Sequence, residues 1–305
     1  MLMVAGEALI DLIVAPDGTV RAIPGGGPLN AARTAARLGT STGFLGRLST
    51  DRFGDQLLAT LTNDGVEALV ADRTDAPTTL AVAEVDVHGA ASYRFYVDGT
   101  SAPDLQFDDV ASVDVPASAL HVGSLGLVVE PLATTVVDLV HRAPTTTVVF
   151  LDLNCRPAAV RDPQRYRERV ASVLARADVV KASTEDLAYL CPGCPPIAAA
   201  EQLLNETTSA VLLTAGPDAS HVLHRTGSTR LPVRRVAIAD TVGAGDAFGA
   251  AFLAWWLRQG FDRTELADAD SVNRAAAAAT EVATDTCTRP GADPPWAKDL
   301  TFGGW

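Results

Sequence analysis

The sequence predicts an α/β protein with a central, mostly parallel sheet, helices on both of its faces and a second, small β-sheet. In the second half of the chain, apolar strand-like runs alternate with helical patterns, which is typical of a parallel sheet covered on both faces. Residues 78–97 instead alternate apolar and polar positions with a period of two, as in a hairpin with one solvated face. Because no linker rich in Pro, Gly or Ser divides the chain, we expect one domain over 1–305, with the small sheet formed within about 12–24 and 78–98.

The individual elements follow from local patterns along the chain. The first apolar run, 2–14, is expected to be one buried strand, although Glu7 and Asp11 interrupt it. Helices are expected where apolar residues recur at helical spacing, and two of them end at a glycine, a frequent helix stop. The expected helices are 24–39, which opens with a Gly-rich turn, 51–65, 163–177, 185–190, 197–206, 244–259 and about 267–284. The further expected strands are 78–87, 92–97, 145–154, 178–183, 209–216, 220–224 and 229–238, and a turn is expected at 88–91.

Composition and charge exclude several classes of partner. Apolar residues make up 48% of the chain and charged residues 20%, so we expect a sizeable core and no global disorder. The formal net charge of −13 argues against nucleic acid and anionic membrane as partners, because both attract clusters of Lys and Arg. No run reaches about 18 uncharged apolar residues, and the N-terminal run lacks a basic start, which argues against a transmembrane helix and a signal peptide.

The cysteines indicate a cytoplasmic enzyme. Four cysteines in 305 residues are too few for a disulfide scaffold. Cys191 and Cys194 have the spacing of a metal or redox pair, but no second ligand pair follows at zinc spacing, and the two trail a helix instead of opening one. We therefore expect a plain loop at 191–194.

The stretch "DTVGAGDAF" (240–248) is the strongest local signal of chemistry. Gly243 and Gly245 allow a tight turn ahead of a helix whose first N–H groups have no internal partner, and such a turn binds anions. The negative charge of Asp246 would repel a bound anion, so its presence in an anion site makes sense only if it acts on a neighbouring group. A carboxylate there could take a proton from a hydroxyl while the amides stabilise a transferring phosphoryl group.

Two alternatives stay open for this stretch on its spacing alone. Asp246 could be a favourable charge in the first turn of a helix. The run is also one residue away from a dinucleotide fingerprint, and hence from an oxidoreductase, although that motif should open a βαβ unit and the rest of this chain is mostly helical.

Four other stretches carry polar residues, mostly at the ends of expected strands. They are "GGGPLN" (25–30), "DLNCRP" (152–157), "KASTEDL" (181–187) and "LLTAGPDAS" (212–220). Asn30 can offer a donor and an acceptor to a polyhydroxyl ligand, and Asp11 can accept from adjacent hydroxyls. Arg156 suits a phosphate or hydroxyl contact, or a surface ion pair. Because ligands bind at the carboxyl edge of an open parallel sheet, we expect these stretches to converge there.

Taken together, these stretches resemble a known family. "GGGPLNAARTAARLG" and "DTVGAGDAFGAAFLA" are similar to the two signatures of the PfkB-type sugar kinases, the ribokinase-like family. "GEALIDL", "GRLSTDRFGD", "HVGS", "DLNCRP", "KASTED", "TAG" and "CTRPGA" appear in the family's order, so the resemblance covers nearly the whole chain. It implies a ribokinase-like fold in which the small sheet is a lid over the sugar and often a dimer contact.

The resemblance also implies a role for each matching residue. The catalytic residues are Asp246 as the base, Gly243, Ala244 and Gly245 as the anion hole, and Arg156 near substrate and phosphates. The sugar-binding residues are Asp11, Gly25, Gly26, Asn30 and, on the lid, Arg94. The nucleotide-binding residues are Lys181, Ser183, Thr214, Gly216, Gly291 and Ala292. Asp186 matches a carboxylate that acts on Mg²⁺ through water, and Asp240 lies where the family holds a monovalent cation.

The implied activity is an ATP-dependent kinase that transfers the γ-phosphate to a primary hydroxyl of a small sugar, with Mg²⁺ and, in many members, K⁺. Fructose is the first candidate, because 92–105 resembles the lid of fructokinase-like members. Kinases of 2-keto-3-deoxygluconate, ribose or nucleosides, and a sugar-binding paralogue without activity, are the alternatives. We expect sugar and ATP as partners, neither nucleic acid nor membrane, and a homodimer formed through the lid. Asp186 stands in place of the family's Glu, which shortens its reach.

Overall fold

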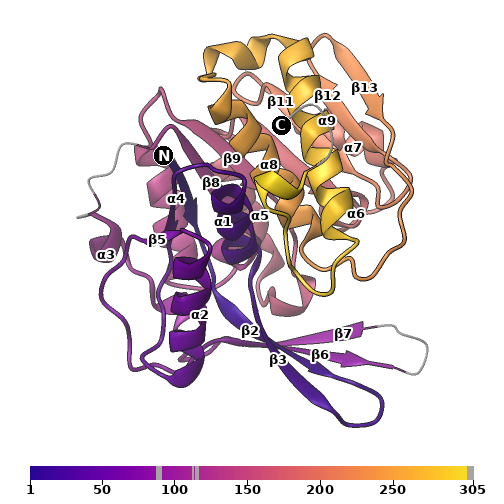
Figure 1. Ribbon diagram of the computed structural model, residues 1–305. Coiled ribbons are helices and arrows are strands. Elements are labelled where there is room, and N and C mark those ends of the chain that lie inside the picture. The colour runs from indigo at the N-terminus through magenta and orange to yellow at the C-terminus, as the bar shows by residue number, and fades with distance from the viewer. Residues whose placement is uncertain (87–90, 112, 114–116, 301–305) are drawn as a thin grey trace.

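A nine-stranded sheet forms the centre of the molecule. The computed structural model describes the chain except residues 87–90, 112, 114–116 and 301–305. The strand order is β13-β12-β11-β10-β9-β8-β1-β4-β5 (Figure 1). Every pairing from β5 to β11 is parallel, whereas β12 is antiparallel to both β11 and β13. The strands are β1 (Leu2–Ala5), β4 (Thr42–Leu45), β5 (Glu67–Ala68), β8 (Ala119–Gly123), β9 (Val148–Asp152), β10 (Val179–Ser183), β11 (Ala210–Thr214), β12 (Ser220–His224) and β13 (Gly227–Leu231).

Helices cover both faces of this sheet, which confirms the predicted α/β architecture. One face packs against α1, α2, α8 and α9, and the other against α4, α5, α6 and α7. The helices are α1 (Gly27–Arg37), α2 (Arg52–Asn63), α3 (Phe107–Ala111), α4 (Leu132–Arg142), α5 (Pro163–Leu174), α6 (Thr184–Leu190), α7 (Pro196–Glu201), α8 (Ala244–Arg258) and α9 (Ala269–Thr286). Among the described residues, no helix combines the length and the apolar character needed to cross a membrane.

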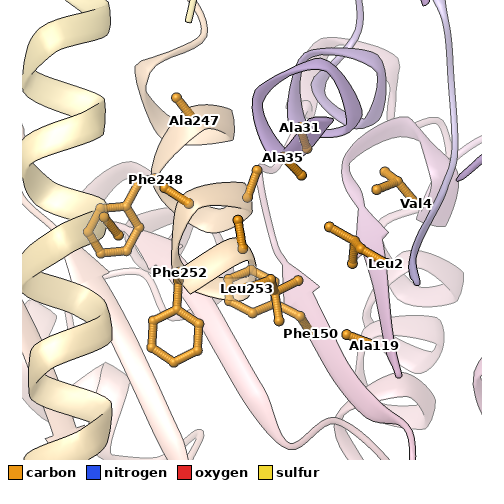
Figure 2. Packing of buried hydrophobic residues seen from close by; sticks show 14 of the residues in the cluster. Leu2, Val4, Ala31, Ala35, Ala119, Phe150, Ala247, Phe248, Phe252 and Leu253 are labelled. Carbon is orange, nitrogen blue, oxygen red and sulfur yellow. The ribbon is translucent and has the colours of Figure 1, made fainter. Parts of the chain in front are cut away.

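Strand alternation divides the core into two layers. In β1, Leu2 and Val4 belong to the layer under α1 and α8, whereas Met3 and Ala5 belong to the opposite layer. Figure 2 shows the first layer from close by, with the aromatic ring of Phe150 between the sheet and α8. Side chains of a parallel strand must be apolar on both faces when helices cover both, so these strands are continuous apolar runs.

Helix α8 lies deepest in the molecule. Its residues 246–256 are all buried, and the rings of Phe252 and Trp256 stack with centroids 5.8 Å apart. A helix that is apolar all round must be enclosed by other elements, and here the sheet, α1 and α9 enclose it. This buried stretch anchors the first turn of α8, which is itself only partly buried.

The second sheet has four strands in the order β3-β2-β6-β7 and projects from one end of the molecule (Figure 1). Strands β2 and β3 are antiparallel, β2 and β6 are parallel, and β6 and β7 are antiparallel. The bounds are β2 (Leu9–Val14), β3 (Val20–Gly25), β6 (Leu80–Val85) and β7 (Ala91–Tyr96). Most of the turn predicted at 88–91 lies outside the described residues.

Two predicted strands differ from the structure. The single strand predicted over 2–14 is wrong, because the chain breaks at Gly6, whose φ is 151°, and β1 and β2 join different sheets. The strand predicted over 229–238 ends early, since β13 stops at Leu231. Pro232 follows, and proline has no N–H to donate to a strand ladder.

Candidate active site

The start of α8 forms the floor of the site. Gly243 caps this helix in a left-handed conformation with φ of 78°, and a Cβ there would lie 2.6 Å from the Cβ of Ala292. Only glycine meets both conditions without displacing its neighbour. The helix that follows has 15 residues, so its unpaired N–H groups and its dipole make this turn a positive end that favours an anion.

Asp246 lies in the first turn of α8 and is buried, with 8% of its surface exposed. Two side-chain amides donate to its two oxygens. Asn30 Nδ2 lies 2.9 Å from Oδ2, and Asn154 Nδ2 lies 3.3 Å from Oδ1. The three residues come from α1, the segment after β9 and α8, so the fold brings together three of the five stretches that were expected to converge.

A cavity of about 640 Å³ opens above Asp246. Its volume lies in the usual range for a pocket that holds a small molecule. Loops at the carboxyl edge of the main sheet provide its polar wall, and the small sheet provides Leu9, Ala81, Tyr93 and Phe95. The predicted residues on its wall are Asp11, Gly26, Asn30, Arg156, Gly243, Gly245 and Asp246.

Carboxyl groups dominate the electrostatics of this first cavity. Burial raises the pKa of Glu7 to about 7, and the nearby Ser124 hydroxyl and Arg156 only partly oppose it. Burial likewise raises the pKa of Asp11 to about 6, with Arg156 lowering it and the charge of Asp246 raising it further. Arg156 is therefore the positive charge that these acids share.

A second cavity, of about 610 Å³, lies on the other side of the same turn. Thr214 and Gly216, which the resemblance assigns to the nucleotide, line it together with Ala244. Gly245, another predicted residue, also lines it, whereas the remaining wall residues were not predicted and include Val236, Ile238 and Phe248 as apolar contacts and Arg234 and Arg235 as cations.

Thr241 and Gly245 line both cavities, so the two spaces meet at the start of α8. Apolar side chains suit a flat base, whereas arginines and a helix N-terminus suit phosphates. The second cavity thus has the chemistry to hold a nucleotide whose last phosphate reaches the turn at Gly245. The first cavity presents Asp246 to that phosphate from the opposite side.

Lys181 lies beneath the turn and not in either cavity. Its Nζ is 2.8 Å and 3.0 Å from the two carboxylate oxygens of Asp152, and both side chains are almost fully buried. Burial acts to lower the pKa of Lys181, but the surrounding carboxylates, Asp152 first among them, outweigh it and raise that pKa. Burial raises the pKa of Asp152 to about 6 despite the lysine.

Other predicted residues support the loops around the site. Ser183 and Asp186 form a capping box at the start of α6, and Asp186 Oδ1 also accepts the N–H of Cys155 at 2.6 Å. Asp240 Oδ1 accepts from Val242 N at 3.1 Å, and its Oδ2 accepts from Gly291 N at 2.9 Å. Asp240 therefore ties the turn before α8 to the segment that carries Gly291 and Ala292.

Gly25 and Arg94 also lie away from the cavity walls. A Cβ on Gly25 would come within 2.0 Å of Asp11 Oδ2, so this glycine makes room for the carboxylate. Arg94 is exposed, because side chains alternate along β7 and those of Tyr93 and Phe95 take the cavity side.

The loop predicted at 191–194 follows α6, but its two cysteines form a disulfide that the prediction of a plain loop did not include. Among the described residues, no group of three or more His, Cys, Asp or Glu side chains is arranged to hold a metal ion.

Sequence reasoning missed Glu7, Asn154 and Thr241 as wall residues. Asn154 lies inside the quoted stretch "DLNCRP", and its position at a strand end was a usable signal. Glu7 follows the first strand in the same way, but it was interpreted as an interruption of a longer strand.

The two cavities meet at a helix N-terminus, and one of them is lined by a carboxylate that can accept a proton. This arrangement is typical of an α/β phosphotransferase that acts on a hydroxyl. The chain belongs to the pfkB family of carbohydrate kinases, whose model matches residues 1–298. The predicted family and the predicted type of enzyme are thereby confirmed.

Similar proteins include several fructokinases. A fructokinase of Rhizobium leguminosarum bv. trifolii is 32% identical over 260 residues, which cover 83% of this chain and 79% of that protein. The structure of a fructokinase from Xylella fastidiosa with bound ATP has a TM-score of 0.86 at 30% identity, covering 95% of this chain and 93% of that one. The structure of a fructokinase from Vibrio cholerae O395 with fructose, ADP and calcium ion has a TM-score of 0.82 at 25% identity, covering 95% and 94%.

Proposed function

We propose that this carbohydrate kinase is an ATP-dependent fructokinase, which transfers the γ-phosphate of ATP to a primary hydroxyl of fructose. The observation that carries the proposal is the meeting of the two cavities at Gly245, beside Asp246. Similar proteins named fructokinase support the choice of sugar, since their structures hold ATP in one case and fructose with ADP in another.

Asp246 acts as the general base in this reaction. Its carboxylate takes the proton of the sugar hydroxyl while the hydroxyl oxygen bonds to the γ-phosphorus, and the bond from that phosphorus to the bridging oxygen of ADP breaks. The N–H groups of Gly243 and Gly245 stabilise the charge on the transferring group, whereas the N–H of Ala244 between them already donates to Thr241 O at 3.3 Å. Arg156 adds a positive charge from the sugar side.

The sugar cavity favours a neutral sugar over a sugar acid. Glu7, Asp11 and Asp246 contribute three carboxyl groups, whereas Arg156 is the one Lys or Arg among the described residues of its wall. A ligand carboxylate would be repelled by this excess of acids, but hydroxyls can donate to them. Asp11, Gly25, Gly26 and Asn30 are assigned to sugar binding, whereas Arg94 could reach the sugar only after a movement of β7.

ATP is assigned to the second cavity, with Thr214, Gly216, Lys181, Ser183, Gly291 and Ala292 on or behind its walls. Both carboxylate oxygens of Asp186 already accept backbone N–H groups, which fits contact with Mg²⁺ through water better than direct ligation. Mg²⁺ held mainly by the phosphates of ATP supplies charge neutralisation there. Asp240 is assigned to a K⁺ site.

The small sheet is proposed as a lid over the sugar and as a dimer contact in a cytoplasmic enzyme. Tyr93 and Phe95 already reach the sugar cavity from β7. Val20 on β3 is 56% exposed and Tyr96 on β7 is 55% exposed, and exposed apolar side chains on the outer strands of a projecting sheet suit an interface. Analytical ultracentrifugation of the wild type and a Tyr96→Asp variant tests the dimer, which the variant should weaken.

A screen of ATP consumption tests the activity. The purified protein is assayed with fructose and other ketoses, pentoses, 2-keto-3-deoxygluconate and nucleosides, each with Mg²⁺ and with or without K⁺. Fructose should give the highest kcat/KM. A higher value for a sugar acid or a nucleoside would contradict the assignment of fructose, and sugar-induced thermal stabilisation without any ATP consumption would contradict the assignment as a kinase.

A further inference from the structure

Asn154 has an unusual backbone conformation next to the base. It follows β9 and has φ of 37°, and among the described residues only Ser124 shares a positive φ without being glycine. Asparagine is one of the few side chains found with some frequency in this region, yet glycine is better suited to it. A residue kept in such a conformation at a reaction site usually has a task there.

The side chain of Asn154 is directed by close packing. Its Nδ2 donates to Asp246 Oδ1 at 3.3 Å, on the side opposite to the bond from Asn30. Gly27 lies close to both groups, since a Cβ on Gly27 would be 2.8 Å from Asn154 Nδ2 and 3.2 Å from Asp246 Oδ1. The backbone of α1 thus closes one side of the amide and of the carboxylate, while both residues line the cavity on another side.

We propose that Asn154 is a positioning residue for the catalytic base: its amide, together with that of Asn30, fixes the rotation of the Asp246 carboxylate. This inference rests on the proposed role of Asp246 as base. A carboxylate can rotate about its Cβ–Cγ bond, and one donor on each oxygen stops that rotation. Each oxygen keeps a second lone pair, so a sugar hydroxyl can still donate its proton to the fixed carboxylate.

A positioning role predicts a loss of turnover without a loss of binding. Proton transfer in the transition state requires an aligned acceptor, whereas Asn154 Nδ2 is already bonded to Asp246 and the other wall residues remain to bind the sugar. Misplacement of a reacting group by about 1 Å costs about 10²-fold in rate. We therefore expect kcat to fall at least about 10-fold in a variant without the amide, with KM for both substrates changed less than about threefold.

Asn154→Gly is the informative variant, because glycine suits φ of 37° and removes only the side chain. Asn63→Gly is the matched control, since Asn63 is exposed at the end of α2, away from the cavity wall. Both variants replace asparagine with glycine, but only the first removes a bond to Asp246. Steady-state kinetics and thermal unfolding are measured for both, using the sugar that the wild-type enzyme turns over fastest.

The expected result is a lower kcat for Asn154→Gly, KM values near those of the wild type and an unchanged or higher Tm, while Asn63→Gly keeps its kcat. Equal kcat values for the wild type and Asn154→Gly would overturn the inference, and so would a rise in KM at constant kcat. If Asn154→Gly does not fold, Asn154→Asp replaces the donor with an acceptor of the same size and should lower kcat at least as much. If Asp246→Asn keeps normal turnover, the proposed role of Asp246 as base is wrong. This result differs from one in which only Asn154→Gly keeps normal turnover, which would contradict the positioning role of Asn154 alone.

Discussion

Lys181 and Asp152 form a bidentate ion pair directly beneath the turn that carries Gly245. A Cβ on Gly245 would lie 3.3 Å from Lys181 Nζ, so the buried ammonium group contacts the backbone of the anion-binding turn from below. The pair thus links two parallel strands, β9 and β10, to the first residues of α8.

Loss of one partner of this pair should destabilise the fold. Lys181→Met leaves the Asp152 carboxylate buried without a counter-charge, and breaking a buried pair in this way costs about 3–5 kcal/mol of unfolding free energy. The double variant Asp152→Asn with Lys181→Met should recover most of that loss. Urea unfolding measures the stability of the single and the double variant. The control is Lys298→Met, which changes the other lysine of the chain at an exposed position. A single variant as stable as the wild type would contradict the structural role of the pair.

Asp246→Asn should remove catalysis but keep the fold. The amide is nearly isosteric with the carboxylate but cannot accept the proton, so kcat should fall by at least about 10²-fold, the scale of general-base catalysis. KM for the sugar should change little, and sugar-induced thermal stabilisation should persist. Asp262→Asn, on the exposed segment after α8, is the control. Near-normal turnover of the Asp246 variant would show that another group accepts the proton.

Gly27→Ala should lower activity through contact with both Asn154 and Asp246. Its added methyl group would lie 2.8 Å from Asn154 Nδ2 and must displace the amide from the base. We expect kcat to fall at least about 10-fold for this reason. Gly126→Ala is the matched control, because a Cβ there meets its nearest atom at 3.6 Å, an ordinary contact distance. The hypothesis fails if both alanine variants retain the same kcat as the wild type.

Glu7 should make the stability of the protein depend on pH. Burial raises its pKa from 4.5 to about 7, so the folded state binds more protons than the unfolded state between these values. The free energy of unfolding therefore falls as the pH rises through this window, by about 3 kcal/mol from this residue alone. Raised pKa values of Asp11 and Asp152 act in the same direction.

Glu7→Gln separates this contribution from the others. The neutral amide resembles the protonated acid, so the variant should gain stability over the wild type at pH 8 and lose that gain at pH 4. Chemical denaturation at both pH values measures the difference, with Glu84→Gln on an exposed position of β6 as the control. A difference between variant and wild type that stays constant with pH would contradict the raised pKa.

The sequence was sufficient for the class of fold and for part of the wall of the first cavity. Glycine spacing marked the start of α8, and strand-end positions predicted that Asn30, Arg156 and Asp246 would converge, as they do around the cavity of about 640 Å³. Local patterns carry this information, because glycines favour a tight turn and polar residues directly after a buried strand favour a ligand site at the edge of the sheet.

Contacts between distant segments could not be predicted in the same way. Lys181 and Asp152 stand opposite each other because β9 and β10 pair in one register, and no local pattern fixes that register. The bond from Asn154 to Asp246 spans 92 residues and depends on where α8 packs. The position of Arg94, in contrast, could be predicted locally, since the period-two pattern of β7 places it on the face opposite to Tyr93 and Phe95.

Thr241 and Gly245, which line both cavities, give the two halves of the site a single position for the phosphate that moves. A sugar phosphate in the first cavity would place its phosphate where the terminal phosphate of ATP must lie. With the proposed assignment of the two cavities, we expect the enzyme to hold ATP with sugar, or ADP with sugar phosphate, but not ATP together with sugar phosphate. Product should then leave before the next nucleotide is fully seated, and accumulated sugar phosphate is expected to compete with both substrates.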